Sequence, residues 1–193
     1  MNNNINIQLY SSCNCSCNFC NFTDTKHCKI NPEFVINYLK ANPHITRILL
    51  TGGEPTLAIE EYTEIIKNID IQNKNVILQT NGWWGNNENI KTILKQYPPT
   101  LVHLSVDYEK QKFIPIETVR EAYTFLIQNN IDVAIVNHHI YDEEFEYYKT
   151  IFPKVINGRI CIDDGINLHD CGTALLANST VGKLNIKGWC SNG

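Results

Sequence analysis

A short segment near the start of the chain, CNCSCNFC, holds the four cysteines Cys13, Cys15, Cys17 and Cys20. Cys13, Cys17 and Cys20 have the spacing C-x3-C-x2-C, which suits three corners of a cubane iron–sulfur cluster. Four-iron clusters ordinarily take four cysteines, so three leave one iron open, much as a catalytic zinc site keeps a position for its substrate. Cys15 breaks this pattern and is expected to point away. A zinc site with Cys15 or Cys28 as the fourth ligand fits the loop equally well.

A second motif, TGGEPT at 51–56, follows the second predicted strand. Its two glycines let the backbone approach a ligand closely, and Pro55 fixes the turn. Glu54 adds a carboxylate that we expect at the mouth of the fold. Alone, the motif is typical of a strand-to-helix turn with a surface glutamate. One strand after the cysteine loop, it favours a site shared with that loop.

Short β-branched runs alternate with amphipathic segments along most of the chain. The predicted strands are 5–10, 45–51, 75–80, 101–107, 131–139 and 155–162, and the predicted helices are 31–42, 57–69, 87–97, 116–130 and 142–152. This alternation predicts an α/β fold with a parallel sheet. A full eight-unit barrel needs about 250 residues. The 193 residues therefore predict a partial (βα)5-6 TIM-like barrel over 1–158 and a short extension over 159–193.

Composition narrows the functional classes. The chain is 43% hydrophobic with a net charge of −4, which favours a folded core and gives no general attraction to nucleic acid or anionic membranes. The N-terminus does not read as a signal peptide, and no apolar run reaches the length of a membrane span. We therefore expect a cytoplasmic protein with no nucleic-acid or membrane partner. In that compartment clustered cysteines more often bind metal than form disulfides.

Polar residues gather after the predicted strands. They are the cysteine loop, TGGEPT, Asn81 in TNGWWG, Ser105 and Asp107 in SVD, and Asn137, His138 and His139. In a parallel α/β barrel the carboxyl ends of the strands meet at one mouth, where active sites form. The pattern predicts one site there.

Together the two motifs resemble the radical S-adenosylmethionine (radical SAM) superfamily over about residues 5–160. Cys13, Cys17 and Cys20 match its cluster motif, with Phe19 as the aromatic residue before the last cysteine, and GGEP matches its second motif. The resemblance implies a [4Fe-4S] cluster whose open iron binds S-adenosylmethionine (SAM). One electron then splits SAM to a 5′-deoxyadenosyl radical, which abstracts hydrogen from a substrate. It also implies an external electron donor of the flavodoxin or ferredoxin type.

The same resemblance assigns cofactor contacts by position. They are Gly52, Gly53 and Glu54 at the methionyl amine of SAM, Asn81 at its carboxylate, Phe19 beside the adenine, Ser105 and Asp107 at the ribose, and Asn137 or His138 at the ribose or adenine. The glycine-containing pattern usual at strand five is absent here. The residues alone leave alternatives open. Ser105 and Asp107 can simply end a strand, Asn81 can belong only to a turn, and Trp83–Trp84 can be packing or an aromatic lid.

The tail holds a second set of cysteines, Cys161, Cys171 and Cys190. Residues 171–190 read as a β-hairpin with Gly182 near its turn. They resemble the start of SPASM or twitch domains, although seven residues, not the usual four, separate Gly182 from Cys190. The three cysteines are expected to bind an auxiliary [4Fe-4S] cluster. The alternatives are buried structural cysteines, or Cys161 as a hydrogen-atom donor to a substrate radical.

Four functions follow from this sequence. The leading one is a radical SAM peptide maturase that forms a crosslink or a thioether or epimerises a residue, because of the cysteine tail. The alternatives are a glycyl-radical-enzyme activating enzyme and an enzyme acting on a small molecule such as a nucleobase precursor. The non-enzymatic alternative is a zinc- or cluster-binding module.

Overall fold

The computed structural model describes residues 3–18, 20, 27–137, 147–148, 150–152 and 161–162, with 137 and 161–162 described by their backbone alone. The strands are β1 (Asn4–Tyr10), β2 (Arg47–Gly52), β3 (Asn75–Thr80), β4 (Leu101–Ser105), β5 (Asp132–Asn137) and β6 (Cys161–Ile162). The helices are α1 (Pro32–Ala41), α2 (Ile59–Asn68), α3 (Glu88–Gln96), α4 (Tyr108–Gln111) and α5 (Ile116–Gln128). Short 3-10 helices are η1 (Pro55–Ala58), η2 (Ile71–Asn73) and η3 (Trp83–Asn86).

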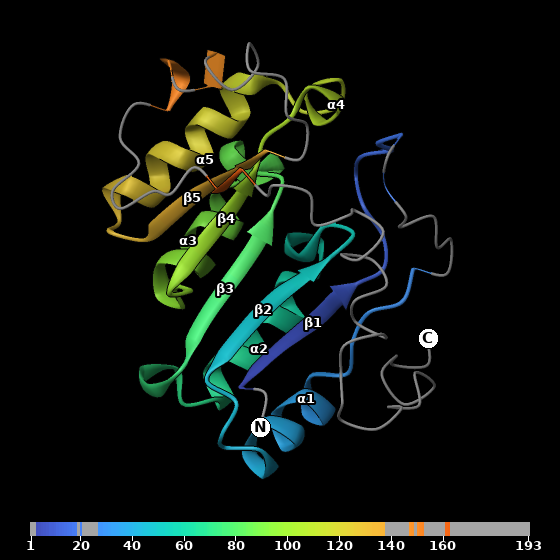
Figure 1. The fold of residues 1–193 in the computed structure, drawn as a ribbon, viewed down its shortest axis with the longest axis vertical. Helices are drawn as coiled ribbons and strands as arrows, with labels where there is room; N and C mark the ends of the chain where they lie inside the picture. Colours follow the sequence, from blue (N-terminus) through green and yellow to red (C-terminus); the bar gives the residue numbers. More distant parts are fainter. Residues whose placement is uncertain are drawn as a thin grey trace.

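All the strand pairs are parallel, and the sheet order follows the chain, β1-β2-β3-β4-β5-β6. Figure 1 shows β1 to β5 side by side with their arrowheads pointing the same way. This confirms the predicted α/β fold with a parallel sheet. Of the predicted sixth strand, only β6 is described, and the C-terminal extension with its proposed hairpin lies outside the described residues.

Local sequence signals explain where the helices begin. The Asn31 side chain accepts hydrogen bonds from the backbone N–H groups of Glu33 and Phe34, and Pro32 occupies the first turn of α1, as predicted. Asn87 caps α3 in the same way. The helix predicted at 57–69 instead starts as η1, because Glu54 caps a tight turn that contains Pro55.

The two faces of the sheet differ in character. Alternate strand residues join the side chains of α1, α2, α3 and α5 in one hydrophobic core; from the strands these are Ile7, Leu9, Ile48, Leu50, Val76, Leu78, Val102 and Leu104. Tyr62 and Trp84 are fully buried in that core. The opposite face, which we call the inner face, is less apolar than the continuous β-branched runs suggested. Gln8, Gln79 and His103 lie on it, each half-buried.

Among the described residues, no helix combines the length and the hydrophobicity needed to cross a membrane.

Candidate active site

The cysteine loop that follows β1 lies directly against the Gly52–Gly53 turn. The Gly53 N–H donates to the Tyr10 carbonyl and the Glu54 N–H donates to the Ser12 carbonyl, both at 2.8 Å. A Cβ on Gly53 would stand 2.2 Å from the Ser12 oxygen, so a side chain there would displace the loop. Gly52 has a φ of 148°, which favours glycine, and its Cβ would lie 2.4 Å from the Tyr10 oxygen. The glycines are therefore needed for contact between the two motifs.

Four free, partly buried thiols lie on this loop: Cys13, Cys15, Cys17 and Cys20. A hydrogen bond from the Cys15 thiol holds the pKa of Cys13 below its ordinary value. The same thiol lowers the pKa of Cys17, with help from the nearby charge of Lys110. The expectation that Cys15 points away is wrong, since its thiol hydrogen-bonds to both predicted ligands, and its own pKa is raised in consequence.

The Glu54 carboxylate is 1% exposed and turns into the protein, not toward the mouth as expected. One oxygen accepts hydrogen bonds from the hydroxyls of Thr56 (2.5 Å) and Thr80 (2.7 Å) and from the Thr56 N–H (3.1 Å). The other accepts from the Asn81 N–H at 2.8 Å. Burial raises the pKa of Glu54, and these four donors act against that shift by stabilising the carboxylate.

Two tryptophans complete this network. The Trp83 indole N–H donates to the Thr56 hydroxyl at 2.8 Å, and the Trp84 indole N–H donates to the Thr80 hydroxyl at 3.1 Å. Each threonine oxygen thus accepts from an indole while its own proton goes to Glu54. Trp84 is 0% exposed, so packing is confirmed for it. Trp83 is half-buried and bonded to the same network.

Asn81 connects this network to the cysteine loop. Its side-chain nitrogen donates to the side-chain oxygen of Asn14 at 2.8 Å and lies 3.5 Å from the Cys15 sulfur, while its side-chain oxygen accepts from the backbone N–H of Trp83 at 3.1 Å. The three loops after β1, β2 and β3 are therefore joined by hydrogen bonds through Glu54 and Asn81. The predicted contact of Asn81 with the SAM carboxylate stays a prediction.

Asp107 and Ser105 lie at the end of β4, where the sequence placed them. Asp107 is fully buried; it caps α4 by accepting from the Lys110 N–H at 2.9 Å, and its other oxygen pairs with the Lys110 ammonium. A ribose contact by Asp107 would share that carboxylate with Lys110. Ser105 is 4% exposed on the inner face. Helix α4 itself was not predicted from the sequence.

The remaining predicted site residues are not placed in the same detail. Phe19, His138, Cys171 and Cys190 lie outside the described residues. Asn137 ends β5 and Cys161 begins β6, but only their backbone is described. Cys28 is disulfide-bonded in this structure.

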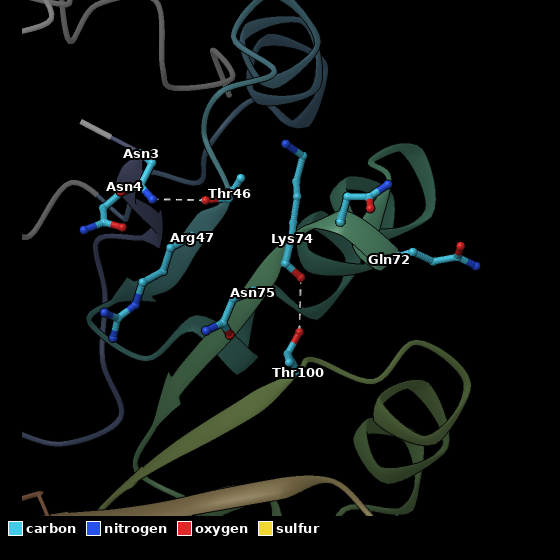
Figure 2. A pocket seen from close by; sticks show the side chains of 9 residues that line it. Asn3, Asn4, Thr46, Arg47, Gln72, Lys74, Asn75 and Thr100 are labelled. Carbon is cyan, nitrogen blue, oxygen red and sulfur yellow. Dashed lines mark hydrogen bonds between the residues drawn. The ribbon is translucent and has the colours of Figure 1, made fainter. Parts of the chain in front are cut away.

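At the other end of the sheet, a shallow depression opens between the amino ends of β1 to β3. Figure 2 shows Asn4, Arg47, Lys74 and Asn75 around it. The Lys74 ammonium already donates to a backbone carbonyl at 2.6 Å, that of Ile45. This depression is far from the cysteine loop and lacks the buried polar residues found there.

The residues at the carboxyl end fit a cubane cluster. Cys13 and Cys17 carry lowered pKa values, and thiolates are the form that binds metal. Cys13, Cys17 and Cys20 are free thiols on one loop, and the glycine turn packed against that loop carries no side chain that would obstruct a cluster. In the described part of the chain, no three His, Cys, Asp or Glu side chains are close enough for a single metal ion.

Sequence reasoning missed four residues of this site: Thr56, Thr80, Asn14 and Lys110. Thr56 and Thr80 donate hydrogen bonds to Glu54, and Asn14 accepts one from Asn81. The charge of Lys110 lowers the pKa of Cys17. A threonine two residues after Glu54 and another immediately before Asn81 were the available signals.

Comparisons with known proteins agree with this geometry. Residues 7–146 match the family model described as the radical SAM superfamily. The chain is 32% identical over 89 residues to "Putative peptide biosynthesis protein YydG" of Bacillus subtilis (strain 168), a match covering 44% of this chain and 28% of that protein.

Two solved structures share the fold. The anSMEcpe structure with bound AdoMet gives a TM-score of 0.57 at 21% identity and covers 76% of this chain and 48% of that one. Streptococcus suis SuiB bound to S-adenosylmethionine gives 0.64 at 14% identity and covers 77% and 37%. The chain thus spans less than half the length of each of these relatives. The family match covers most of the chain, and the chain belongs to the radical SAM superfamily.

Proposed function

We propose that this chain is a radical SAM enzyme that holds a [4Fe-4S] cluster through Cys13, Cys17 and Cys20 and acts on a peptide. One observation carries the proposal: the thiol loop packs against Gly53 at a distance that leaves no room for a side chain. When bound, the cluster and SAM supply one-electron cleavage of a sulfonium and hence hydrogen abstraction. The protein binds both, orients them and excludes water.

The chain's own residues perform the binding. The backbone around Gly52–Gly53 offers the surface for the methionyl amine, since the Glu54 carboxylate is already satisfied by Thr56, Thr80 and Asn81. Ser105 and Asp107 are proposed ribose contacts, with Asn137 or His138 nearby in sequence and Phe19 at the adenine. Lys110 brings positive charge near Cys17, which favours its thiolate.

A peptide substrate is supported by YydG, whose name describes peptide biosynthesis. A separate electron donor of the flavodoxin or ferredoxin type is proposed because the chain belongs to the radical SAM superfamily, whose cluster must be reduced before it acts. The tail at 159–193 is proposed to bind an auxiliary [4Fe-4S] cluster through Cys161, Cys171 and Cys190. Cys161 as a hydrogen-atom donor remains the alternative.

Anaerobic reconstitution tests these proposals. We expect about four irons per chain for one cluster and about eight for two. The triple variant Cys161→Ala/Cys171→Ala/Cys190→Ala should then fall from about eight to about four while still forming 5′-deoxyadenosine under strong reductant. Zinc without iron, and no 5′-deoxyadenosine, would contradict the enzyme and favour a binding module.

A further inference from the structure

The inner face of the sheet carries a row of four polar side chains just below the proposed active site. Strand register pairs Gln8 with Thr51 and Gln79 with His103. Leu50 pairs with Leu78, so the next residues along, Thr51 and Gln79, are also neighbours. Paired residues of parallel strands point to the same face, so all four side chains share the inner face. We call Gln8, Thr51, Gln79 and His103 the polar row.

The next level of the inner face is apolar on the three central strands of this region, β2 to β4. One level further from the site, the same face carries Leu49, Ile77 and Leu101, which are paired in register. Ile77 is 1% exposed, and the other two are half-buried. Asn6 and Asp132 flank this level on β1 and β5, so apolar side chains border the polar row on β2 to β4.

The four side chains have unused hydrogen-bonding capacity. All are half-buried, and in the part of the chain that the structure describes none makes a side-chain hydrogen bond to another protein group. Glu54, Thr56 and Thr80, on the neighbouring level, are all paired. Half-buried polar groups without partners are expected to bind water or a ligand.

The chemistry of the row favours an uncharged ligand. Two carboxamides, a hydroxyl and an imidazole each donate and accept hydrogen bonds, and none of the first three carries charge. Burial and the charge of Arg47 lower the pKa of His103 to about 4, which leaves the imidazole neutral at physiological pH. Within the row an anion such as phosphate would find no opposite charge; Arg47, the cation whose charge acts on His103, lies two levels away on this face.

The length of the row fits an extended peptide. Neighbouring strands are about 4.8 Å apart, so four side chains span about 14 Å, which is about four residues of extended chain. A peptide backbone offers donors and acceptors in alternation, and each side chain of the row can pair with either. We propose that the polar row binds the backbone amides of the peptide substrate and holds it beneath the thiol loop; this deepens the proposed function and rests on it.

The test is an NMR titration of the full chain without cofactors, so it does not depend on cluster assembly. The reporters are the side-chain NH2 signals of Gln8 and Gln79 and the ring signals of His103. The probes are a blocked tripeptide (N-acetyl-trialanine methylamide), inorganic phosphate and adenosine. The Gln72 signal is the internal control, because Gln72 is exposed at the opposite end of the sheet.

We expect the blocked tripeptide to shift the three reporters and to leave Gln72 unchanged. Gln79→Leu should weaken the affinity by between about twofold and about tenfold, the effect of one neutral hydrogen bond. Gln79→Glu should weaken it at least as much, because it adds a charge. Neither change leaves a protein group unpaired, so both variants should fold; Gln72→Leu is the matched control.

Three outcomes would overturn the inference. These are no shift with any probe, shifts with phosphate or adenosine but not with the tripeptide, and tripeptide shifts that persist unchanged in Gln79→Leu. Because the proposed function is tested by iron and 5′-deoxyadenosine, its failure and the failure of the polar row are separately visible.

Discussion

The two ends of the sheet are both polar, yet they are built differently. At the amino end, Asn4, Arg47 and Asn75 are exposed around an open depression. At the carboxyl end, Glu54 and Asn81 are buried and joined by hydrogen bonds to the cysteine loop. Polarity alone therefore does not mark a site in this fold. Buried polar groups cost free energy unless satisfied, and the buried Glu54 and Asn81 beside the thiols are satisfied by hydrogen bonds.

The largest expected difference between the two ends is in metal binding. Single replacement of Cys13, Cys17 or Cys20 by serine should remove about four irons per chain after anaerobic reconstitution, the content of one cluster. Gln72→Ala at the amino end should leave the iron content unchanged. Iron and sulfide analysis on matched preparations measures both. Full iron content in all three serine variants would remove the proposed ligands.

We expect a methyl group on Gly53 to push the cysteine loop away from the Gly52–Glu54 turn. In Gly53→Ala the new Cβ meets the Ser12 carbonyl at 2.2 Å, and backbone cannot move aside as a side chain can. We expect a loss of about 3 kcal/mol in the free energy of unfolding, measured by urea denaturation. Asn75→Ala, exposed at the other end, should change it by less than about 0.5 kcal/mol. Equal values for the two variants would contradict the close contact.

We expect the hydroxyl group of Thr80 to contribute more to the stability of the fold than its methyl group does. Thr80→Val keeps the shape but removes one of the four donors to Glu54 and leaves the Trp84 indole N–H without its acceptor, at a cost of about 2 kcal/mol. Thr80→Ser keeps the hydroxyl and loses one methyl, about 1 kcal/mol. Thr63→Val is the control, since that hydroxyl only bonds its own helix. If valine were tolerated better than serine, the hydrogen-bond network would not stabilise the fold.

We expect the contribution of Glu54 to the free energy of unfolding to depend on pH. Burial raises its folded-state pKa above the ordinary 4.5, so its stabilising contribution is complete at low pH and is lost as pH rises through the folded value. The variant Glu54→Gln carries an amide that does not titrate. The free energy of unfolding of wild type relative to this variant should therefore decrease as pH rises from about 4.5, the ordinary value. An increase over that window would reverse the assignment.

His103 gives the smallest expected effect. Its pKa is lowered to about 4 by burial and by Arg47. A folded-state value below the ordinary 6.5 means that its contribution to stability is present above pH 6.5 and is lost as pH falls toward 4. Ring proton shifts followed by NMR should show no transition near 6.5. A normal transition there would show that the imidazole is freely solvated.

The sequence predicted the parallel α/β fold and the alignment of the two motifs, because periodicity and spacing are local signals. Asn31 and Pro32 placed the start of α1 correctly for the same reason. The direction of Glu54 was not predictable, since it depends on Thr80 and Asn81, which lie about 26 residues along the chain. Cys15 was misread because its position relative to Cys13 and Cys17 depends on the fold of the loop. The polar row could not be predicted from the sequence, because it depends on the register between neighbouring strands.

The central claim is that the cysteine loop and the Gly52–Glu54 turn form one cofactor site with an open iron. Electron paramagnetic resonance of the reconstituted, reduced chain tests it most directly, with spectra recorded before and after addition of SAM. The account predicts a reduced-cluster signal whose g-values change on addition of SAM, and no such change in Gly53→Ala. A cluster signal that SAM leaves unaltered, or no cluster signal at all, would contradict it.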